Sequence, residues 1–281
     1  MKGEPRSDTC WLCGRSTFDR VVRTPAWEIR RCRSCGLESK VGGPSIRYDE
    51  LDDAEFAVFD YDRSKEVDDL IGCVELVMPF ERGVGVLEIG CGTGAVLNEF
   101  RKRGALVSGF EPSPAAVARA RSLYDLTTVV NSPFQPSGAP GAEKILLLND
   151  VIEHLGDCAA LFSSIRGSMT DDAVLIVKTG DSAALNARLY PDRWAYFLLE
   201  QHVTFYCERA IRELSDRTGF TVAALRRQVH AFGGSALWDM TKNLAKAAVL
   251  RSTSAQFSHH RRLQINVAYD HLIAVLVPRR R

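Results

Sequence analysis

The chain has 281 residues and a formal net charge of +1, with 46% hydrophobic and 25% charged residues. These ordinary globular values predict one large domain or a domain with a small appendage, and the near-neutral charge argues against whole-molecule attraction to nucleic acid or anionic lipid. No apolar run is long enough to span a bilayer, and no apolar stretch follows the first residues as in a secretory signal, so we expect a cytoplasmic protein without membrane contact.

Four of the eight cysteines form two pairs near the start of the chain. Two residues separate Cys10 from Cys13 and also Cys32 from Cys35, and eighteen residues lie between the pairs. This spacing is typical of a four-thiolate Zn²⁺ site, because each tight turn aims two sulfurs at one ion. We therefore expect a zinc-binding module over residues 1–42, whose closed metal site folds a segment too small to fold alone. The isolated cysteines are expected in the core: Cys73, Cys91, Cys158 and Cys207.

The rest of this module is expected to be a short hairpin. Residues 17–30 alternate apolar and polar positions around Pro25, which predicts two strands. Gly14 and Gly36 directly follow the cysteine pairs, where a tight turn favours positive φ. The Val-Gly-Gly-Pro sequence at residues 41–44 is typical of a linker.

An acidic, helical lead-in is expected over residues 43–80. Asp and Glu are frequent between residues 49 and 69, and apolar positions from Val67 to Val77 keep helical spacing. Pro79 is expected to end this helix, because proline cannot continue the helical hydrogen bonds.

From residue 84 onward, short apolar runs alternate with helical patterns. Strands are expected at 84–89, 105–110, 127–130, 144–148 and 173–177. This alternation predicts an α/β domain over residues 81–281, with a doubly wound parallel sheet covered by helices on both faces. Two further runs, 220–225 and 272–277, predict closing strands around an insert at about 231–270, with the last strand antiparallel.

A glycine-rich loop follows the first of these strands. Gly90, Gly92 and Gly94 precede a helix, whose first N–H groups have no partner within the helix and can face an anion. Glu111 ends the second strand, where a carboxylate can accept hydrogen bonds from both hydroxyls of a ribose. This arrangement indicates an adenosine-containing cofactor, and it also comes close to the dinucleotide fingerprint.

Three features favour another cofactor over NAD. Glu88, two residues before the loop, would repel a pyrophosphate and suits a ligand that carries an ammonium group. The fourth strand leads into a polar cluster at residues 149–154, at the edge of the sheet where ligands of open α/β folds bind. The last strand is expected to be antiparallel, in place of a sixth parallel strand.

In these stretches the chain resembles the class I S-adenosylmethionine-dependent methyltransferases, whose core is a Rossmann-like sheet of seven strands. The matching segments are residues 86–94, 109–113 and 148–155, with a looser match over 194–220. Some bacterial small-molecule methyltransferases of this kind also carry an N-terminal four-cysteine zinc module. The resemblance implies S-adenosylmethionine as the cofactor, in addition to the structural Zn²⁺.

The resemblance also implies where the cofactor would lie. Glu88 and the glycine loop would hold its methionine part, Glu111 its ribose, and Asn131 with Ser132 would stand where the family usually contacts adenine. Tyr61 or Lys65 would close the site from the preceding helix. The full set of predicted cofactor-binding residues is Tyr61, Glu88, Gly90, Cys91, Gly92, Gly94, Glu111, Pro112, Asn131, Ser132, Asn149 and Asp150.

Two histidines are the candidate catalytic residues. His202 suits the role of general base at neutral pH, with substrate orientation or packing as its alternative role. His154 either contacts the acceptor or makes a structural hydrogen bond. Related sugar C-methyltransferases use a Tyr-His-Glu-His run, and residues 199–202 lack its tyrosine, which favours oxygen or nitrogen over carbon as the methylated atom. No supporting context accompanies His230, His259, His260 or His271.

These features predict a methyltransferase acting on a small polar metabolite, such as a sugar or an intermediate of natural-product biosynthesis. A zinc-bearing rRNA base methyltransferase is the main alternative, favoured by basic residues before position 40 and at 279–281. The acidic segment and the absence of an Asp-Pro-Pro-Tyr motif after the fourth strand argue against that nucleic-acid partner. A catalytically inert zinc module and an NAD-linked oxidoreductase are the remaining alternatives.

Overall fold

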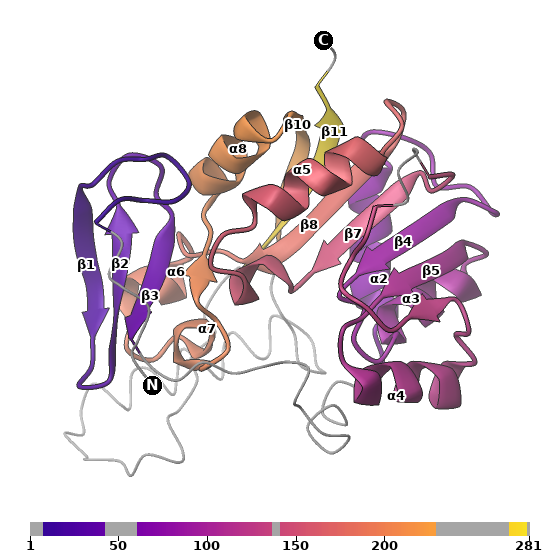
Figure 1. The fold of residues 1–281 in the computed structure, drawn as a ribbon, viewed down its shortest axis with the longest axis horizontal. Helices are drawn as coiled ribbons and strands as arrows, with labels where there is room; N and C mark the ends of the chain where they lie inside the picture. Colours follow the sequence, from indigo (N-terminus) through magenta and orange to yellow (C-terminus); the bar gives the residue numbers. More distant parts are fainter. Residues whose placement is uncertain (1–7, 43–60, 137–140, 229–269, 280–281) are drawn as a thin grey trace.

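A computed structural model describes residues 8–42, 61–136, 141–228 and 270–279. Two sheets lie side by side in it (Figure 1), one of four strands in the order β1-β2-β3-β9 and one of seven in the order β10-β11-β8-β7-β4-β5-β6. The strands are β1 (Phe18–Arg23), β2 (Trp27–Cys32), β3 (Glu38–Gly42), β4 (Gly85–Ile89), β5 (Leu106–Phe110), β6 (Val129–Val130), β7 (Ile145–Asn149), β8 (Val174–Gly180), β9 (Thr204–Phe205), β10 (Phe220–Gln228) and β11 (His271–Pro278).

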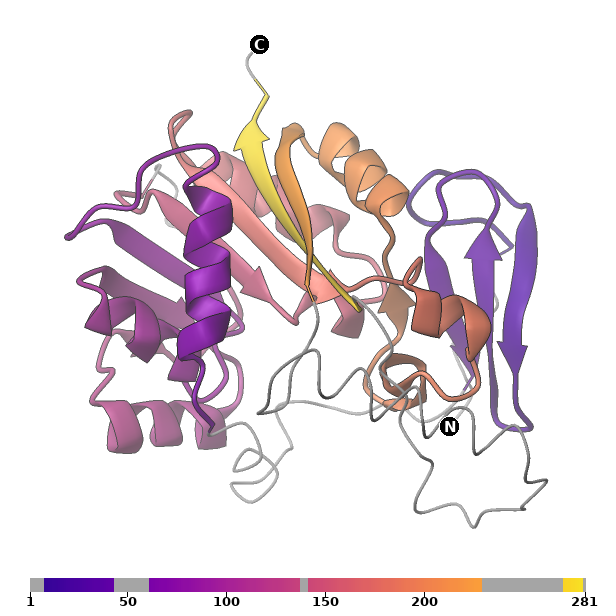
Figure 2. The same cartoon turned by 180° about the vertical axis from the view of Figure 1, so that it is seen from behind.

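Helices connect and cover these strands. They are α2 (Ser64–Val74), α3 (Ala95–Lys102), α4 (Pro114–Tyr124), α5 (Ala159–Ser168), α6 (Leu185–Leu189), α7 (Ala195–Leu198) and α8 (Glu208–Arg217), with a short 3-10 turn, η2 (Ile152–His154). Figures 1 and 2 show α5 and α8 on one face of the large sheet and α2 and α3 on the other. No helix in the described ranges is long and apolar enough to cross a bilayer.

The large sheet has the predicted doubly wound topology. β4 pairs in parallel with both β5 and β7, and β7 with β8, so the strand order reverses between β4 and β7. β11 runs antiparallel to β8 and β10, as expected for the closing strands. In open α/β sheets, ligands bind at the carboxyl ends of the strands near such a reversal.

The strands alternate their side chains between two apolar cores. Ile145 and Leu147 of β7 pack on the side of α2 and α3, whereas Leu146 and Leu148 pack on the side of α5 and α8. All seven residues of β8 are buried, as expected for a strand covered on both faces. The seven-stranded α/β fold predicted from the sequence is therefore confirmed.

One helix boundary differs from the sequence prediction. The helix expected to end at Pro79 ends at Val74, and the N–H groups of Val77 and Met78 bond back to the carbonyl of Val74. Residues 231–269 of the expected insert lie outside the described residues, as does the acidic stretch up to residue 60.

The N-terminal hairpin is confirmed, and the first two residues of the expected linker after it belong to a strand, whereas residues 43 and 44 lie outside the described residues. β1 and β2 pair around Pro25, and Gly14 and Gly36 have the expected positive φ of 71° and 78°. A third strand, β3, continues to Gly42 and so occupies the first half of the Val-Gly-Gly-Pro sequence. β3 also pairs with β9, a strand of the large domain, so the module and that domain share one sheet.

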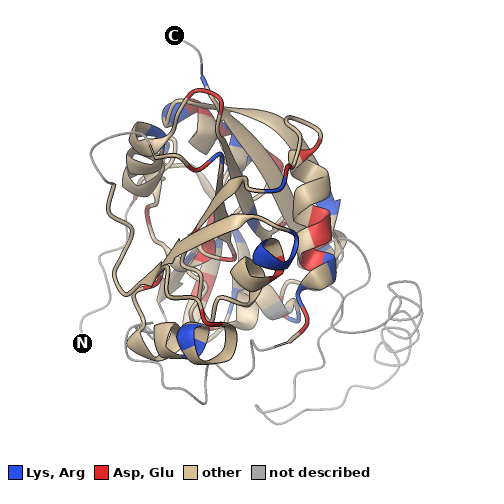
Figure 3. Cartoon of the chain, turned by 90° about the vertical axis from the view of Figure 1, so that its right-hand side faces the viewer, with Lys and Arg blue, Asp and Glu red and all other residues tan. Residues whose placement is uncertain are grey.

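Charge is spread over the described part of the chain. In Figure 3, Lys and Arg positions are interspersed with Asp and Glu positions along the ribbon, in keeping with the net charge of +1. Cys73, Cys91 and Cys158 are buried as expected, whereas Cys207 is half-buried, with its Sγ 3.6 Å from the carbonyl oxygen of Gly36.

Candidate functional site

The glycine loop after β4 needs its glycines. Gly90 and Gly94 both have φ of 75°, and a Cβ would lie 2.9 Å from Val151 at the first and 2.6 Å from Leu126 at the second. Side chains at these positions would therefore be strained by both backbone and neighbours. Gly94 also stands as the N-terminal cap of α3, so the loop is set by the start of that helix.

The N–H groups of this loop are turned inward. Gly90 and Cys91 donate to the carbonyl of Phe110 at 2.7 and 3.2 Å, and Gly92 donates to Oε2 of Glu111 at 2.8 Å. Gly94 donates to the carbonyl of Cys91 at 2.9 Å. These four N–H groups of the loop thus have partners within the protein, so the loop itself does not offer them to an anion.

Glu111 is held in one orientation at the end of β5. Its Oε2 accepts from the N–H of Gly92 and its Oε1 from the N–H of Ser113, both at 2.8 Å. Burial raises the pKa of this carboxyl, and the two backbone hydrogen bonds oppose that rise. Each oxygen keeps a further lone pair, so the carboxylate can accept two hydroxyl groups of a ribose.

Glu88 is a buried carboxylate that lacks a full set of partners. It is 2% exposed, and within the described chain its Oε2 makes no hydrogen bond. Burial raises the pKa of Glu88 well above its usual value, and the nearby carboxylate of Glu66 adds to the rise. The Oδ1 of Asn149, at the end of neighbouring β7, is also buried without a hydrogen bond. Oε2 of Glu88 and Oδ1 of Asn149 are therefore two buried acceptors that a donor of a bound ligand could satisfy at this edge of the sheet.

A buried lysine that the sequence analysis missed lies beside them. Lys178 is 1% exposed on β8, and its Nζ lies 2.6 Å from Oδ2 of Asp150 and 2.8 Å from Oε1 of Glu66. Burial alone would lower the pKa of Lys178, but the two carboxylates raise it above its usual value. A charged residue inside the apolar run of β8 was the signal in the sequence.

The same charges fix the helix that precedes β4. Glu66 of α2 also pairs with Arg63 at 2.7 Å, whose guanidinium lies 3.8 Å from the ring centre of Tyr61. Burial would raise the pKa of Glu66, but Lys178 and Arg63 bring it down to about 2. Tyr61 is thereby joined to the Asp150 region, whereas Lys65 pairs with Asp69 on the surface.

The two predicted catalytic histidines lie together. The ring centres of His154 and His202 are 4.8 Å apart. Nδ1 of His154 lies 3.1 Å from the main-chain carbonyl of Gln201, and Nδ1 of His202 lies 3.0 Å from that of Tyr196. Because a carbonyl only accepts, Nδ1 of His202 carries the proton, and Nε2 of its neutral ring is the acceptor. Burial lowers the pKa of His202 well below its usual value, and His154 lowers it further, so the ring is neutral at pH 7.

Tyr196 supplies a tyrosine beside His202, although residues 199–202 contain none. Its ring lies 4.1 Å from that of His202 and directly over Gly180, where a Cβ would be 2.4 Å from the tyrosine. Its hydroxyl donates to Glu153, which also accepts from Thr179 at 2.8 Å. Glu153, His154 and His202 offer ligand atoms within 4.8 Å of one another, close enough to share a cation.

His271, which had no supporting context in the sequence, also belongs to this edge. It begins β11, and its Nδ1 lies 3.0 Å from Asp270 and its Nε2 3.7 Å from Asp150. The sequence analysis missed it because it lies on the far side of the insert from the other site residues. Pairing of β11 with β8 is what brings His271 opposite Gly180.

The residues predicted for adenine hold the neighbouring turn. Nδ2 of Asn131 donates to the carbonyls of Glu111 and Pro112, both at 3.0 Å. The hydroxyl of Ser132 donates a hydrogen bond to the carbonyl of Pro133. Asn131 therefore stabilises the turn after β5, which carries Glu111.

The four paired cysteines converge. Sγ of Cys10 lies 3.6 Å from that of Cys35, and Sγ of Cys13 lies 3.5 Å from that of Cys32, with all four within 4.8 Å of one another. A tetrahedral ion with sulfur bonds of about 2.3 Å would place its ligands about 3.8 Å apart. The cluster fits such an ion and is too wide for disulfides.

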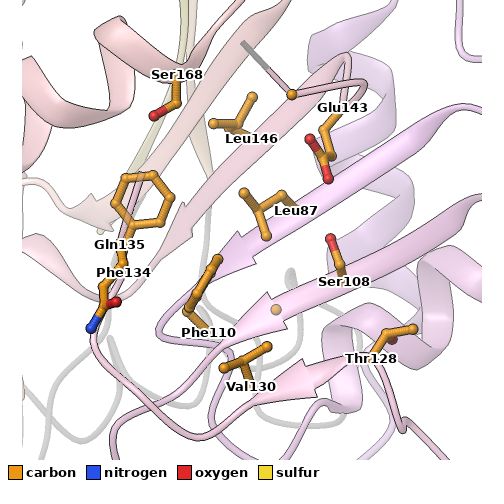
Figure 4. A pocket seen from close by; sticks show the side chains of 12 residues that line it. Leu87, Ser108, Phe110, Thr128, Val130, Phe134, Gln135, Glu143, Leu146 and Ser168 are labelled. Carbon is orange, nitrogen blue, oxygen red and sulfur yellow. The ribbon is translucent and has the colours of Figure 1, made fainter. Parts of the chain in front are cut away.

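A pocket of about 210 Å³ lies on the face of the large sheet opposite to the face that carries the side chain of Glu88. Figure 4 shows Leu87, Phe110 and Leu146 among its lining side chains, with Phe134 of the segment between β6 and β7 beside them. Leu87 and Glu88 point to opposite faces because they are consecutive on one strand. The pocket is therefore separate from the polar edge described above.

Comparisons with known proteins identify the family of this chain. A sequence model for a methyltransferase domain matches residues 59–225. A ubiquinone biosynthesis O-methyltransferase of Rhodopseudomonas palustris (strain TIE-1) is 30% identical over 101 residues, covering 34% of this chain and 40% of the relative. That of strain HaA2 is 27% identical over 162 residues, covering 54% and 58%. The matches thus span well under two thirds of these relatives.

Solved structures show the same fold. The cyclopropane synthase MmaA2 of Mycobacterium tuberculosis has a TM-score of 0.53 at 18% identity, covering 76% of this chain and 83% of its own. A phospholethanolamine N-methyltransferase 2 of Haemonchus contortus, solved with S-adenosylhomocysteine, has a TM-score of 0.50 at 13% identity, covering 86% and 63%.

Replacing the buried lysine should destabilise the fold. We expect Lys178→Met to lower the free energy of unfolding by about 3 kcal/mol, because Asp150 and Glu66 lose their shared buried cation. Urea unfolding followed by circular dichroism measures the loss. Lys144→Met, which removes an exposed pair with Asp172, is the matched control and should cost under about 1 kcal/mol. Equal losses in the two variants would contradict the structural role of Lys178.

Proposed function

The chain belongs to the methyltransferase domain family, and we propose that it is an S-adenosylmethionine-dependent methyltransferase that methylates oxygen or nitrogen of a small polar metabolite. The cofactor assignment rests on Glu88 and the loop beside it. An oxygen of Glu88 is buried without a hydrogen bond, and N–H groups of the loop already bond other groups of the protein. An ammonium group satisfies this oxygen, whereas a pyrophosphate would be repelled by the carboxylate of Glu88.

The residues present fit the cofactor. Glu88 and the Oδ1 of Asn149 would accept hydrogen bonds from the methionine part, and the prearranged carboxylate of Glu111 would accept the ribose hydroxyls. Tyr61, tied to α2 through Arg63, would cover the bound molecule. When bound, S-adenosylmethionine supplies a methyl group on a positively charged sulfur, and an acceptor atom in line with the carbon–sulfur bond would take the methyl carbon while the sulfur leaves.

The protein's own part in this reaction is to position the acceptor, exclude water and take up a proton. His202 is neutral and keeps Nε2 as an acceptor, so it can receive the proton of a hydroxyl or amine. Its ring is fixed by Tyr196, and Asp150 with His271 offers further polar contacts for the acceptor. The curated relatives are named O-methyltransferases, which supports oxygen as the methylated atom.

The metal assignment completes the proposal. Cys10, Cys13, Cys32 and Cys35 would hold one Zn²⁺ through four thiolates, and such a closed site serves the fold of the module. We expect the zinc-loaded protein to carry one ion per chain, and Cys32→Ser to lose most of it, as measured by elemental analysis after dialysis. Cys73→Ser is the matched control and should keep its metal. A metal-rich Cys32→Ser protein would refute the assignment.

Removing the charge of Glu88 should separate binding from stability. We expect Glu88→Gln to weaken S-adenosylhomocysteine binding by at least about tenfold, because a charge-assisted hydrogen bond to the ammonium group is lost. At pH 7 its unfolding midpoint should stay level or rise, since the native state no longer has to bury or protonate a carboxylate. Calorimetry and thermal unfolding measure the two effects.

Glu213→Gln, an exposed change on α8, is the matched control for that experiment and should alter neither quantity. Unchanged affinity in Glu88→Gln would remove Glu88 from the cofactor site. Binding of a nicotinamide dinucleotide in place of S-adenosylhomocysteine would contradict the cofactor itself.

The acceptor class can be tested with methyl-labelled S-adenosylmethionine and a panel of sugars, phenols and amines read by mass spectrometry. With an acceptor so found, we expect His202→Ala to slow methyl transfer about 10²–10⁴-fold. Affinity for S-adenosylhomocysteine should stay within about twofold, because His202 is placed on the acceptor side. Transfer at the wild-type rate would dismiss His202 as the base.

A further inference from the structure

The segment that carries His202 is clamped between the cysteine module and the large domain. We define residues 199–207 as the acceptor loop. On the module side, the main-chain N–H of Lys40 donates to the carbonyl of Val203 at 2.8 Å, and its Nζ donates to the carbonyl of Leu199 at 2.6 Å. The pairing of β3 with β9 continues this contact along the strand.

The large domain holds the other side of the acceptor loop. The N–H of Val203 donates to the carbonyl of Glu153 at 2.8 Å, and Oγ1 of Thr204 donates to the carbonyl of Leu155 at 2.7 Å. His154 adds its bond to the carbonyl of Gln201. His202 therefore lies between hydrogen bonds from the module on one side and hydrogen bonds from the large domain on the other, and both are needed to hold the loop.

The module side of this clamp is continuous with the cysteine cluster. β3 begins three residues after Cys35, and the turn at Gly36 lies against Cys207 at the end of the acceptor loop. Nη2 of Arg209 bonds the carbonyl of Arg33, between the two cysteines of that pair. Cys10, Cys32 and Cys35 share one apolar cluster with Tyr206 and with α8. Any change in the metal site therefore reaches the acceptor loop through direct contacts.

The cofactor residues lie further from the module. Glu88 lies near the end of β4 and Glu111 follows β5, and β7 and β8 stand between these strands and the closing strands of the sheet. Figure 1 shows the module at the opposite end of the molecule from β4 and β5. The bonds that fix Glu111 come from Gly92, Ser113, Val130 and Asn131, all within residues 92–131.

We propose that the metal-bound module is a positioning element for the acceptor side alone, so that metal loss releases His202 while cofactor binding persists. Lys40 is the positioning residue at this junction, because it bonds the acceptor loop at two points and its ammonium lies 5.1 Å from the ring centre of Trp27 and 5.8 Å from that of Phe205. The functional part of this inference rests on the proposed role of His202.

Hydrogen exchange read by mass spectrometry tests the proposal on the whole chain. Removing the metal with a chelator should speed exchange in the peptides covering 199–207 on the order of a hundredfold, and change those covering 85–111 less than about threefold. Affinity for S-adenosylhomocysteine should stay within about threefold. An unchanged acceptor loop, or loss of S-adenosylhomocysteine binding with the metal, would overturn the proposal.

Variants that keep the metal test the same point without apoprotein. We expect Lys40→Met to speed exchange in the acceptor loop about tenfold, because a hydrogen bond from a charged group is lost, and Lys40→Arg to restore most of the protection. Lys144→Met is the matched control and should leave the loop unchanged. Equal exchange in Lys40→Met and the wild type would overturn the role of Lys40.

The proposed function and the positioning role of the module can be refuted separately. If the intact protein does not bind S-adenosylhomocysteine, the proposed function falls, while the exchange data still decide whether the module fixes the acceptor loop. If binding is intact and the loop ignores the metal, only the positioning role falls.

Discussion

A carboxylate buried without a full set of partners is costly, and the site is organised around one. Glu88, near the end of β4, has an oxygen that makes no hydrogen bond within the described residues, while the N–H groups of Gly90, Cys91 and Gly92 bond Phe110 and Glu111. Beside Glu88, the edge of the sheet therefore presents buried acceptors. Such a surface selects a cationic ligand, since only a positive group recovers the free energy lost on burying the acid.

Lys178 extends that principle to the acceptor side. Its position on β8 places a positive charge between Asp150 and Glu66, so both carboxylates are compensated, and Lys178 opposes the effect of Glu66 on the neighbouring Glu88. The same bridge ties α2 to the sheet and brings Tyr61 into place. Lys178 thus links α2 to the polar edge of the sheet, whereas the segment that carries His202, the proposed base, is fixed separately by the shared strand β9.

Features with a local cause were predictable from the sequence. The apolar runs predicted the strands of the large sheet, and the paired cysteines predicted the thiol cluster. The spacing of Glu88, the glycines and Glu111 predicted a cofactor site at the edge of the sheet. The misses arise from contacts between distant segments. Pairing of β3 with β9, the meeting of Tyr196 with His202 and the arrival of His271 beside Asp150 depend on tertiary packing that no local pattern records. The inward hydrogen bonds of the loop were missed for the same reason.

Proton release on cofactor binding tests the central claim most directly. Because burial raises the pKa of Glu88 in the free protein, an arriving ammonium group should ionise it. Calorimetric titration with S-adenosylhomocysteine at pH 7, in buffers of different ionisation enthalpy, should show release of up to about one proton, with weaker binding at lower pH, and Glu88→Gln should abolish the release. Binding of equal strength from acid to neutral pH with no proton exchanged would contradict this account.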